Sequence, residues 1–376
     1  IADDAQSAWT RRCVRQADLV LLVARADAAT DLATTRSLLD ADGRRGVRRR
    51  TRLLLLHADD AARPHGTGKR LAELRLDRHH HVRWDRPAEI DRLARLCARR
   101  GIGLVLGGGG ARGFAHIGVI RALREAGVAI DTIGGTSLGA LIAAQHAKGW
   151  TPEEMLEANF NAFVGRKPHR ALTLPMISVI SDRRGVEMVA EMFPDLDIED
   201  LWLNTFAVSA NLSSARQVVH RNGSVGLALK ASSAIPGIFA PAVATRDLLV
   251  DGGLLNNLPG DVMRRSWGGQ VISVDVSPTR DLRIDGAISR LPSAWSILWS
   301  RLNPFVERIE APNILEILTR ASTLASVRNT AQAKAEADLY LAPPVDGFKL
   351  FDMADLDQLV EIGYEHAIER LATWED

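Results

Sequence analysis

The chain has only two cysteines, Cys13 and Cys97, among its 376 residues. Two cysteines are too few for a disulfide framework, and their spacing matches no metal-binding motif. We therefore expect a reducing compartment and a cytoplasmic location. Long apolar runs are missing too, since 19–24 and 53–56 are only as long as strands. The sequence therefore predicts no membrane-spanning segment.

An excess of charge of either sign is also absent. The 47 basic residues nearly balance the 46 acidic ones, and the net charge of +1 gives no global footprint for nucleic acid. Only six of the basic residues are lysines, and the arginine excess is typical of a GC-rich genome. We interpret the arginines between Arg44 and Arg52 as a solvated loop, with phosphate contacts as the alternative.

Residues 1–100 predict a small α/β segment. Apolar runs at 18–24 and 51–57 predict two buried strands, and residues 31–39 between them predict a helix. The three histidines at 79–81 are a weak metal site, because successive side chains on a strand point to opposite faces. We expect no metal and no cofactor. Since the first residue is Ile1, we interpret the segment as the remnant of an upstream regulatory region.

From Gly101 onwards the sequence alternates strands, tight turns and helices. The first unit has a strand at 102–106, a glycine-rich turn at 107–113 and a helix at 114–126. The second has a strand at 130–134 and a helix at 138–147. Two such units in succession predict an α/β fold, with a mostly parallel sheet between two layers of helices.

The remaining sequence divides into a cap, further strands and a helical end. Residues 151–204 have a helix-like pattern and are predicted to cap a site. More strands are predicted at 205–210, 217–220, 248–250 and 271–276. We expect a catalytic domain over 101–277, with a mainly helical region over 278–376 packed on it.

Gly135, Ser137 and Gly139 fit the pattern G-x-S-x-G between a predicted strand and a predicted helix. Small neighbours allow such a serine to occupy a strained turn with its hydroxyl exposed. Backbone donors at the start of the helix would stabilise negative charge there. Taken alone, the pattern is equally consistent with a plain glycine turn.

The turn at 107–113 has two interpretations. Gly108, Gly110 and Gly113 fit the dinucleotide pattern G-x-G-x-x-G, and Asp131 follows at roughly the spacing of a ribose-binding acid. Alternatively, four successive glycines form a donor-rich turn that cradles an oxyanion. A dehydrogenase has no use for the second turn around Ser137, which favours the oxyanion.

Asp251 is the candidate base for Ser137. It ends an apolar strand and precedes two glycines, and the carboxyl ends of parallel strands converge on one crevice. A carboxylate must be partly desolvated to accept a proton from serine. A turn-forming role for Asp251 is the alternative. We assign no triad histidine, because His366 is predicted within a helix and His116 is predicted to be structural.

At this point the sequence resembles a known family. The motifs are Gly-Gly-Gly-Gly-Ala-Arg-Gly at 107–113, Gly-Thr-Ser-Leu-Gly at 135–139 and Asp-Gly-Gly at 251–253. In this order they are similar to those of the patatin-like phospholipases. Further stretches at 116–120, 198–202, 219–221, 233–239 and 249–259 resemble the neuropathy target esterase branch, which includes lysophospholipases. The resemblance is good over 101–277 and weaker at 9–18.

The resemblance implies a patatin-like three-layer α/β/α fold and a Ser-Asp dyad of Ser137 and Asp251. It implies an oxyanion hole in the glycine turn, with Gly135 and Gly139 shaping the turn that carries the nucleophile. The residues of the oxyanion hole are then Gly108, Gly109, Gly110, Ala111, Arg112 and Gly113. Arg112 is also a candidate contact to a lipid phosphate. Long family members carry cyclic-nucleotide-binding modules and a membrane helix upstream, and neither is visible in this sequence.

We therefore expect a serine hydrolase of phospholipids or lysophospholipids that associates peripherally with a membrane surface and binds no nucleic acid. Residues 293–310 have apolar side chains at helical spacing, including Trp295 and Trp299, and we interpret them as a packed face, with a membrane interface as the alternative. Two other functions stay open, which are a catalytically inactive lipid-binding or scaffold module and a dinucleotide-binding oxidoreductase.

Overall fold

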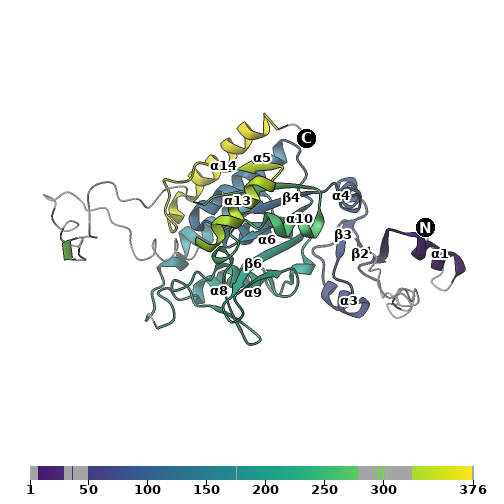
Figure 1. Ribbon diagram of the computed structural model, residues 1–376, viewed down its shortest axis with the longest axis horizontal. Coiled ribbons are helices and arrows are strands. Elements are labelled where there is room, and N and C mark those ends of the chain that lie inside the picture. The colour runs from purple at the N-terminus through teal and green to yellow at the C-terminus, as the bar shows by residue number, and fades with distance from the viewer. Residues whose placement is uncertain are drawn as a thin grey trace.

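The computed structural model describes residues 7–28, 36, 50–174, 176–277, 293, 295–296, 299, 303 and 324–374. These residues form two sheets, one of three strands and one of eight. Figure 1 shows the smaller sheet beside one end of the larger α/β unit, on the side of the N-terminus. The predicted helix at 31–39 lies outside the described residues except for residue 36.

The smaller sheet is parallel, with the order β1-β2-β3. Its strands are β1 (Leu19–Arg25), β2 (Arg50–His57) and β3 (His79–Arg83), so both predicted strands are confirmed and the histidine run forms the third. Leucines from β2 and from α3 form its core. The helices of this part are α1 (Ala8–Gln16), α3 (Thr67–Leu74) and α4 (Pro87–Cys97).

The larger sheet confirms the prediction of a mostly parallel α/β architecture. Five strands run parallel, in the order β11 (Leu339–Leu341), β10 (Gln270–Val274), β4 (Ile102–Leu106), β5 (Thr132–Thr136) and β6 (Asn204–Asn211). Three further strands form antiparallel pairs: β7 (Arg216–His220) and β9 (Asp247–Asp251) each pair with β6, and β8 (Ala242–Ala244) pairs with β9.

Three details of this sheet differ from the prediction. β5 begins two residues later, because the carboxylate of Asp131 accepts a hydrogen bond from the amide of Ile102 and ties the loop to β4. β8 and β11 were not predicted, since strands of three residues are too short to show a period. β11 interrupts the segment that was predicted to be mainly helical.

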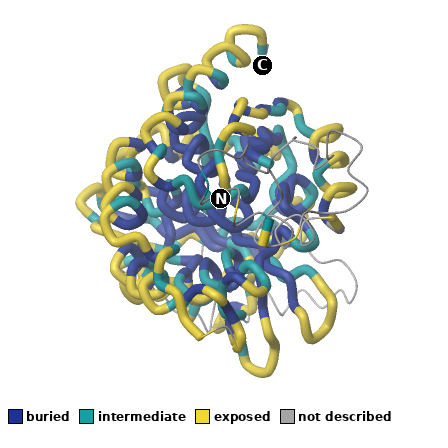
Figure 2. Tube along the Cα trace, turned by 90° about the vertical axis from the view of Figure 1, so that its left-hand side faces the viewer, coloured by how far each residue is buried: buried dark blue, intermediate teal, exposed yellow. Residues whose placement is uncertain are grey.

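Two layers of helices cover the larger sheet. On one face, α5 (Ala115–Glu125), α6 (Leu138–Lys148) and α14 (Leu356–Leu371) pack on Leu104 and Leu106. On the other, α10 (Gly260–Trp267) and α13 (Val327–Glu336) pack on Val105. Successive side chains of a strand point to opposite faces, and these three are fully buried. Figure 2 shows this buried centre within an exposed rim.

The backbones of helices α5 and α14 are in direct contact at two glycines. A Cβ atom on Gly118 would lie 1.8 Å from the carbonyl oxygen of Val360, and one on Gly363 would lie 2.0 Å from that of Ala115. Only glycine fits at such a crossing. The C-terminal helix is therefore part of the larger unit's packing, beside the helix that follows the glycine turn (Figure 1).

Short helices between β5 and β8 surround one end of the sheet, and all but the one at Val225–Ser233 lie within residues 151–204, the region predicted as a cap. They are α7 (Pro152–Asn159), the π-helical turn η2 (Phe160–Gly165), the 3-10 turns η3 (Pro168–Arg170) and η4 (Ile198–Asp200), α8 (Arg183–Met192) and α9 (Val225–Ser233). Four further 3-10 turns are η1 (Gly110–Phe114), η5 (Gly252–Leu254), η6 (Leu324–Ser326) and η7 (Met353–Asp355).

The smaller unit is held to the larger one by polar contacts at η4. The amides of Gly66 and Thr67 donate to the carboxylate of Asp200 at 3.2 and 3.0 Å. His81 lies 2.9 Å from the carbonyl oxygen of Glu199 through its Nε2 atom. A second contact is the ion pair of Arg95 with the buried Asp131, at 2.7 Å. The two units therefore share buried polar groups.

Candidate active site

Ser137 occupies the strained turn that its sequence pattern predicts. Its φ of 55° and ψ of −128° are unusual for a residue with a side chain. Cβ atoms on Gly135 and Gly139 would each lie 2.3 Å from the carbonyl oxygen of Leu106, so neither position accepts a larger residue. The amide of Ser137 donates to Oγ of the buried Ser232 at 2.8 Å, which fixes the turn.

Asp251 reaches Ser137 because β5 and β9 pair with the same edge of β6. Residues 207 and 208 of β6 pair with both β5 and β7, so these two strands lie on opposite edges. Residues 209–211 pair with both β7 and β9, so β9 must share the edge of β5. Thr136 lies opposite Val208, and Asp251 lies opposite Ser209. Ser137 and Asp251 therefore follow one another along one edge.

The carboxyl group of Asp251 is buried beside the serine. Its Oδ1 accepts a hydrogen bond of 2.7 Å from the amide of Gly253. Burial raises the pKa of Asp251 to about 6, while hydrogen bonds from the Gly253 amide and the Ser137 hydroxyl oppose that rise. A carboxylate in this setting is a far better proton acceptor than an exposed one.

Some backbone amides of the glycine turn are hydrogen-bonded to other parts of the protein, and others have no acceptor in the described part of the chain. Gly108 donates to the carbonyl oxygen of Asn257 at 3.2 Å, and Ala111 donates to that of Leu350 at 2.9 Å. Among the described residues, no acceptor lies on the amides of Gly109 and Gly110. Gly110 has a φ of 58°, a conformation that glycine adopts without strain. Two adjacent amides are thus free to bind a ligand.

The side chains around this turn hold it in place. Asn257 donates from Nδ2 to the carbonyl oxygen of Gly108 at 2.9 Å, so it contacts Gly108 twice. Arg112 donates from Nε to the carbonyl oxygen of Gly109 at 3.1 Å and is buried, so it braces the turn from within. Gly113 packs against Leu138 at the start of α6. The sequence analysis did not predict a role for Asn257. Its two hydrogen bonds with Gly108 show that it holds the glycine turn in place.

The amide of Leu138 was also missed in the sequence analysis. It follows Ser137 directly in the first turn of α6, where backbone amides have no partner within the helix. Among the described residues, none supplies an acceptor for it. The position directly after a nucleophilic serine is itself the signal, because that amide commonly completes an oxyanion hole.

Three other polar residues considered from the sequence have structural partners. The Nε2 atom of the buried His116 lies 2.8 Å from the carbonyl oxygen of Gly107. His366 accepts a hydrogen bond from the amide of Ala342 at 3.1 Å. Asp131 is 1% exposed and is bound by Arg95 and by the amide of Ile102, which leaves it no role at a ribose. This geometry argues against the dinucleotide interpretation.

The histidine run at 79–81 forms no metal centre. His79 and His81 lie on one face of β3, with ring centroids 5.0 Å apart, and His57 stacks edge-on against His81. Burial lowers the pKa of His79 to about 4. In the part of the chain that is described, no three His, Cys, Asp or Glu side chains could hold a metal ion.

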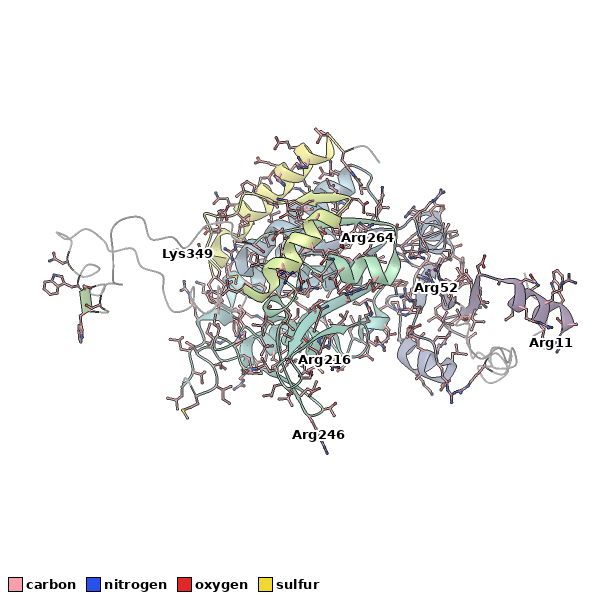
Figure 3. All side chains as sticks on the ribbon, viewed as in Figure 1. Arg11, Arg52, Arg216, Arg246, Arg264 and Lys349 are labelled. Atoms are coloured by element: carbon pink, nitrogen blue, oxygen red, sulfur yellow. The ribbon has the colours of Figure 1, made fainter. Side chains whose placement is uncertain are left out.

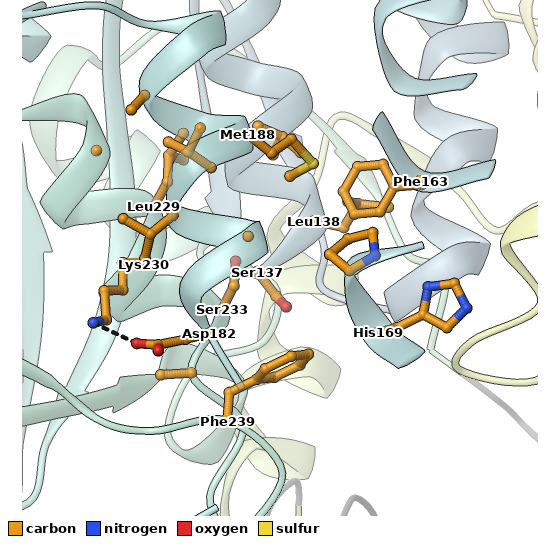
Figure 4. Close-up of a pocket in the computed structure, with 18 of the residues that line it drawn as sticks. Ser137, Leu138, Phe163, His169, Asp182, Met188, Leu229, Lys230, Ser233 and Phe239 are labelled. Atoms are coloured by element: carbon orange, nitrogen blue, oxygen red, sulfur yellow. Dashed lines mark ion pairs between the residues drawn. The ribbon is translucent and has the colours of Figure 1, made fainter. Parts of the chain in front are cut away.

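Ser137 opens into a cavity of about 670 Å³. Most of its walls are apolar, and they come mainly from the predicted cap, from α9 and the loop after it, and from the segment 350–353. Figure 4 shows the hydroxyl of Ser137 in the cavity, with Phe163 and Phe239 nearby. The ion pair of Lys230 and Asp182, at 2.6 Å, lies on one side of it (Figure 4). A long apolar chain with a polar end fits such a space.

Comparison with known proteins agrees with this geometry. A family model described as patatin-like phospholipase matches residues 104–263, and one described as the neuropathy target esterase family P-loop-like domain matches residues 1–102. The chain belongs to the patatin-like phospholipase family. The second match places it in the neuropathy target esterase branch of that family. The three-layer α/β/α unit, which the first match covers in large part, has the patatin-like fold.

Among curated relatives, human patatin-like phospholipase domain-containing protein 6 is 33% identical over 99% of this chain, which covers 29% of that protein. Rat patatin-like phospholipase domain-containing protein 7 is 31% identical over 99% of this chain and 30% of its own length. The chain therefore spans less than a third of these relatives. A solved structure, VipD from Legionella pneumophila, aligns with 73% of this chain and 67% of its own at 15% identity, with a TM-score of 0.41.

Proposed function

We propose that this family member is a serine hydrolase that cleaves the carboxylic esters of lysophospholipids, with Ser137 as nucleophile and Asp251 as base. One observation carries the proposal. A serine in a strained strand-to-helix turn lies against a buried carboxyl group whose pKa is raised to about 6, at the wall of a large apolar cavity. Names of curated relatives as phospholipases and as an esterase support the same class of reaction.

The proposed reaction has two steps. The Oγ atom of Ser137 attacks the ester carbonyl carbon while its proton passes to Asp251, and the glycerol alcohol then leaves with that proton. Water next attacks the acyl-serine and gives a proton to Asp251, the bond between the acyl carbon and Oγ breaks to release the fatty acid, and Asp251 passes the proton to Oγ, which restores the hydroxyl of Ser137. Both tetrahedral intermediates carry an oxyanion, which the free amides of Gly109, Gly110 and Leu138 would stabilise.

The cavity supports a substrate with one long acyl chain. Its apolar lining gains free energy by removing that chain from water, at roughly 25 cal/mol per Å² of apolar surface. The ammonium group of Lys230 lies at the cavity wall in an ion pair with Asp182, and both side chains are 33% exposed, so the ammonium group remains accessible to a ligand. We assign Lys230 as the contact for the phosphate of the headgroup, in place of the buried Arg112.

An exposed apolar loop beside the cavity supports peripheral membrane binding. Leu172, Leu174, Met176 and Ile177 are 73–82% exposed at its tip. A hydrogen bond of 3.1 Å from the amide of Thr173 to the carbonyl oxygen of Val179 closes the loop. Apolar side chains that project together in this way are typical of a surface that enters a lipid interface.

Charges at the base of this apolar loop (172–179) complement an anionic membrane. The described residues form no ion pair with Lys167, Arg170 or Arg184, which flank the loop in the sequence. Cations near a membrane surface are attracted to anionic lipids and extend toward the headgroups. Residues 168–169 and 181–182, on either side of the loop, line the cavity of Ser137. No helix among the described residues is long and apolar enough to cross a bilayer.

Release of fatty acid from lysophosphatidylcholine tests the proposed function. The protein should release it, whereas Ser137→Ala should be inactive, since the acyl acceptor is lost. Ser233→Ala is the matched control, because Ser233 lines the same cavity and should be dispensable. Equal activity of Ser137→Ala and the control would exclude Ser137 as nucleophile. Folded protein without activity on any ester would instead support the inactive lipid-binding module.

A further inference from the structure

A second cavity, of about 160 Å³, lies between the smaller and the larger sheet. It adjoins the amino ends of β2, β3 and β6, the end of β7 and the last residue of α10. Its lining residues are Arg52, Asp77, Arg78, His79, His80, Ile198, Asn204, Thr205, Arg221, Asn222 and Trp267. Figure 3 labels Arg52 at this junction. The cavity far exceeds the roughly 10–15 Å³ that one water requires.

The charges around this interdomain cavity are mostly positive. Arg52, Arg78 and Arg221 come from three separate segments, and Asp77 is the one carboxylate among the lining residues. Within the described part of the chain, none of the three guanidinium groups forms an ion pair with a carboxylate. Burial lowers the pKa of both Arg52 and Arg221, and repulsion by the nearby Arg78 lowers it further. Unpaired cations that share a cavity are costly unless an anion joins them.

Arg52 carries the strongest indication of a missing partner. It is 5% exposed, and its Nη1 atom donates to Nε2 of His80 at 3.1 Å and to the carbonyl oxygen of Leu96 at 3.3 Å. Burial and the nearby Arg52 hold the pKa of His80 well below its usual value, so its ring is neutral and accepts that hydrogen bond. The Nε atom of Arg52 is buried without any partner. Such an unsatisfied charged donor is rare in proteins.

Arg78 and Arg221 form the other side of the cavity. Both donate to Ser266 near the end of α10, Arg78 to the carbonyl oxygen and Arg221 to Oγ. The guanidinium of Arg221 also lies over the ring of Trp267, at 5.8 Å from its centroid. Each guanidinium has five N–H donors, so these contacts hold the two side chains toward the cavity and leave donors for a ligand.

We propose that this interdomain cavity binds the phosphate group of a small water-soluble molecule. A guanidinium group donates two parallel hydrogen bonds to the oxygens of a phosphate. Three such groups from separate segments can surround a phosphate, and they offer more donors than a single carboxylate could accept. The bound anion connects β2 of the smaller unit with the end of β7 in the larger one. It therefore stabilises the junction between the two units.

The proposed anion site is independent of the catalytic one. Asn204 at the cavity begins β6, and Ser209, opposite Asp251, lies five residues further on, about 17 Å along the strand. The site is also distinct from a P-loop. That loop carries G-x-x-x-x-G-K-S/T, a pattern absent from the sequence, and it follows the carboxyl end of a strand. Arg52 and Arg78 instead lie at the amino ends of β2 and β3.

Isothermal titration calorimetry and thermal unfolding of the whole chain test the proposal, with inorganic phosphate and pyrophosphate at constant ionic strength. We expect saturable binding and a melting temperature that rises with ligand concentration. Arg221→Gln should weaken binding by about tenfold or more, because a charge-assisted contact is lost. Arg246→Gln changes an exposed arginine at the lower edge of the larger unit in Figure 3, away from the labelled Arg52, and should bind like the wild type.

Two further arms separate the outcomes. Arg52→Gln removes the buried cation. This variant should unfold at a higher temperature than the wild type in phosphate-free buffer, or it should lose the rise in melting temperature with phosphate. Arg221→Gln, at an exposed position, should lose the same rise without disturbing the core. Vesicles of phosphatidylcholine with and without phosphatidic acid test a lipid headgroup as the source of the phosphate. Absence of saturable binding, equal weakening by Arg246→Gln, or binding only to phosphatidic acid vesicles would overturn the proposal.

Discussion

Asp251 stands one position beyond Thr136 along the edge of β6, and this register brings its carboxylate to the hydroxyl of Ser137. Val208 pairs with Thr136, and the next residue, Ser209, pairs with Asp251. Gly252 is required beside this junction, because a Cβ atom there would lie 2.3 Å from the carbonyl oxygen of Val208. The proposed dyad therefore depends on one strand that serves as the template for two others.

The strain at Ser137 predicts a difference in stability between two inactive variants. Ser137→Ala and Ser137→Gly both remove the hydroxyl and should both abolish activity. Glycine adopts a φ of 55° without the steric cost that alanine pays, so Ser137→Gly should be more stable by about 1 kcal/mol. Urea unfolding measures the difference. Equal stability of the two variants would mean that the turn is not strained in solution.

The raised pKa of Asp251 predicts the pH dependence of hydrolysis. The carboxyl group accepts a proton from Ser137 only when it is ionised, and its pKa is about 6. The rate constant kcat/KM should therefore rise with pH through an apparent pKa near 6 and level off above pH 7. A profile measured on a soluble short-chain ester avoids changes in the lipid interface. A rate that is constant from pH 5 to pH 8 would contradict a base with this pKa.

The same burial predicts a stability cost at neutral pH. A carboxyl group with a pKa near 6 when folded and about 3.9 when unfolded binds protons more tightly in the folded state. Its contribution therefore lowers the free energy of unfolding as pH rises from about 4 through 6. Asp251→Asn should be more stable than the wild type at pH 8, by on the order of 2 kcal/mol, and the difference should vanish near pH 4. A destabilised variant at pH 8 would contradict this cost.

The apolar loop (172–179) predicts a separation of membrane binding from chemistry. Leu174→Asp with Met176→Asp should greatly reduce flotation with vesicles of phosphatidylcholine and phosphatidylserine, because the charged tip no longer enters the interface. Hydrolysis of a soluble short-chain ester should be unchanged. Val243→Asp is a matched control, since Val243 is also an exposed apolar residue, in β8. Unchanged flotation of the loop variant would exclude this surface.

Much of the fold was predictable because it depends on local patterns. The apolar runs of β2 and β4 and the glycine turns before α5 and α6 are visible in a single sequence. Most of residues 293–310, which were predicted to form a packed face, lie outside the described residues. The described Trp295 and Trp299 are 80% and 65% exposed, so the packed interpretation is wrong for those two.

The site was predictable in its residues but not in its partners. Ser137 and the glycine turn follow from spacing, whereas the contacts of Asn257 and Leu350 with the turn join segments far apart in the sequence. No local pattern reveals which amides of the turn are already occupied. The cluster of Arg52, Arg78 and Arg221 is equally invisible, because these residues meet only when the two units pack together.

The most direct test of the proposed catalytic serine is covalent labelling with a fluorophosphonate probe, followed by mass mapping of the labelled peptide. We expect one modified residue, Ser137, because among the described residues it alone combines a hydroxyl at the wall of the large cavity, a buried base and free amides for the oxyanion. Labelling should disappear in Ser137→Ala and persist in Ser233→Ala. Folded, unlabelled wild-type protein, or a label on Ser233 instead, would contradict the assignment of Ser137 as the nucleophile.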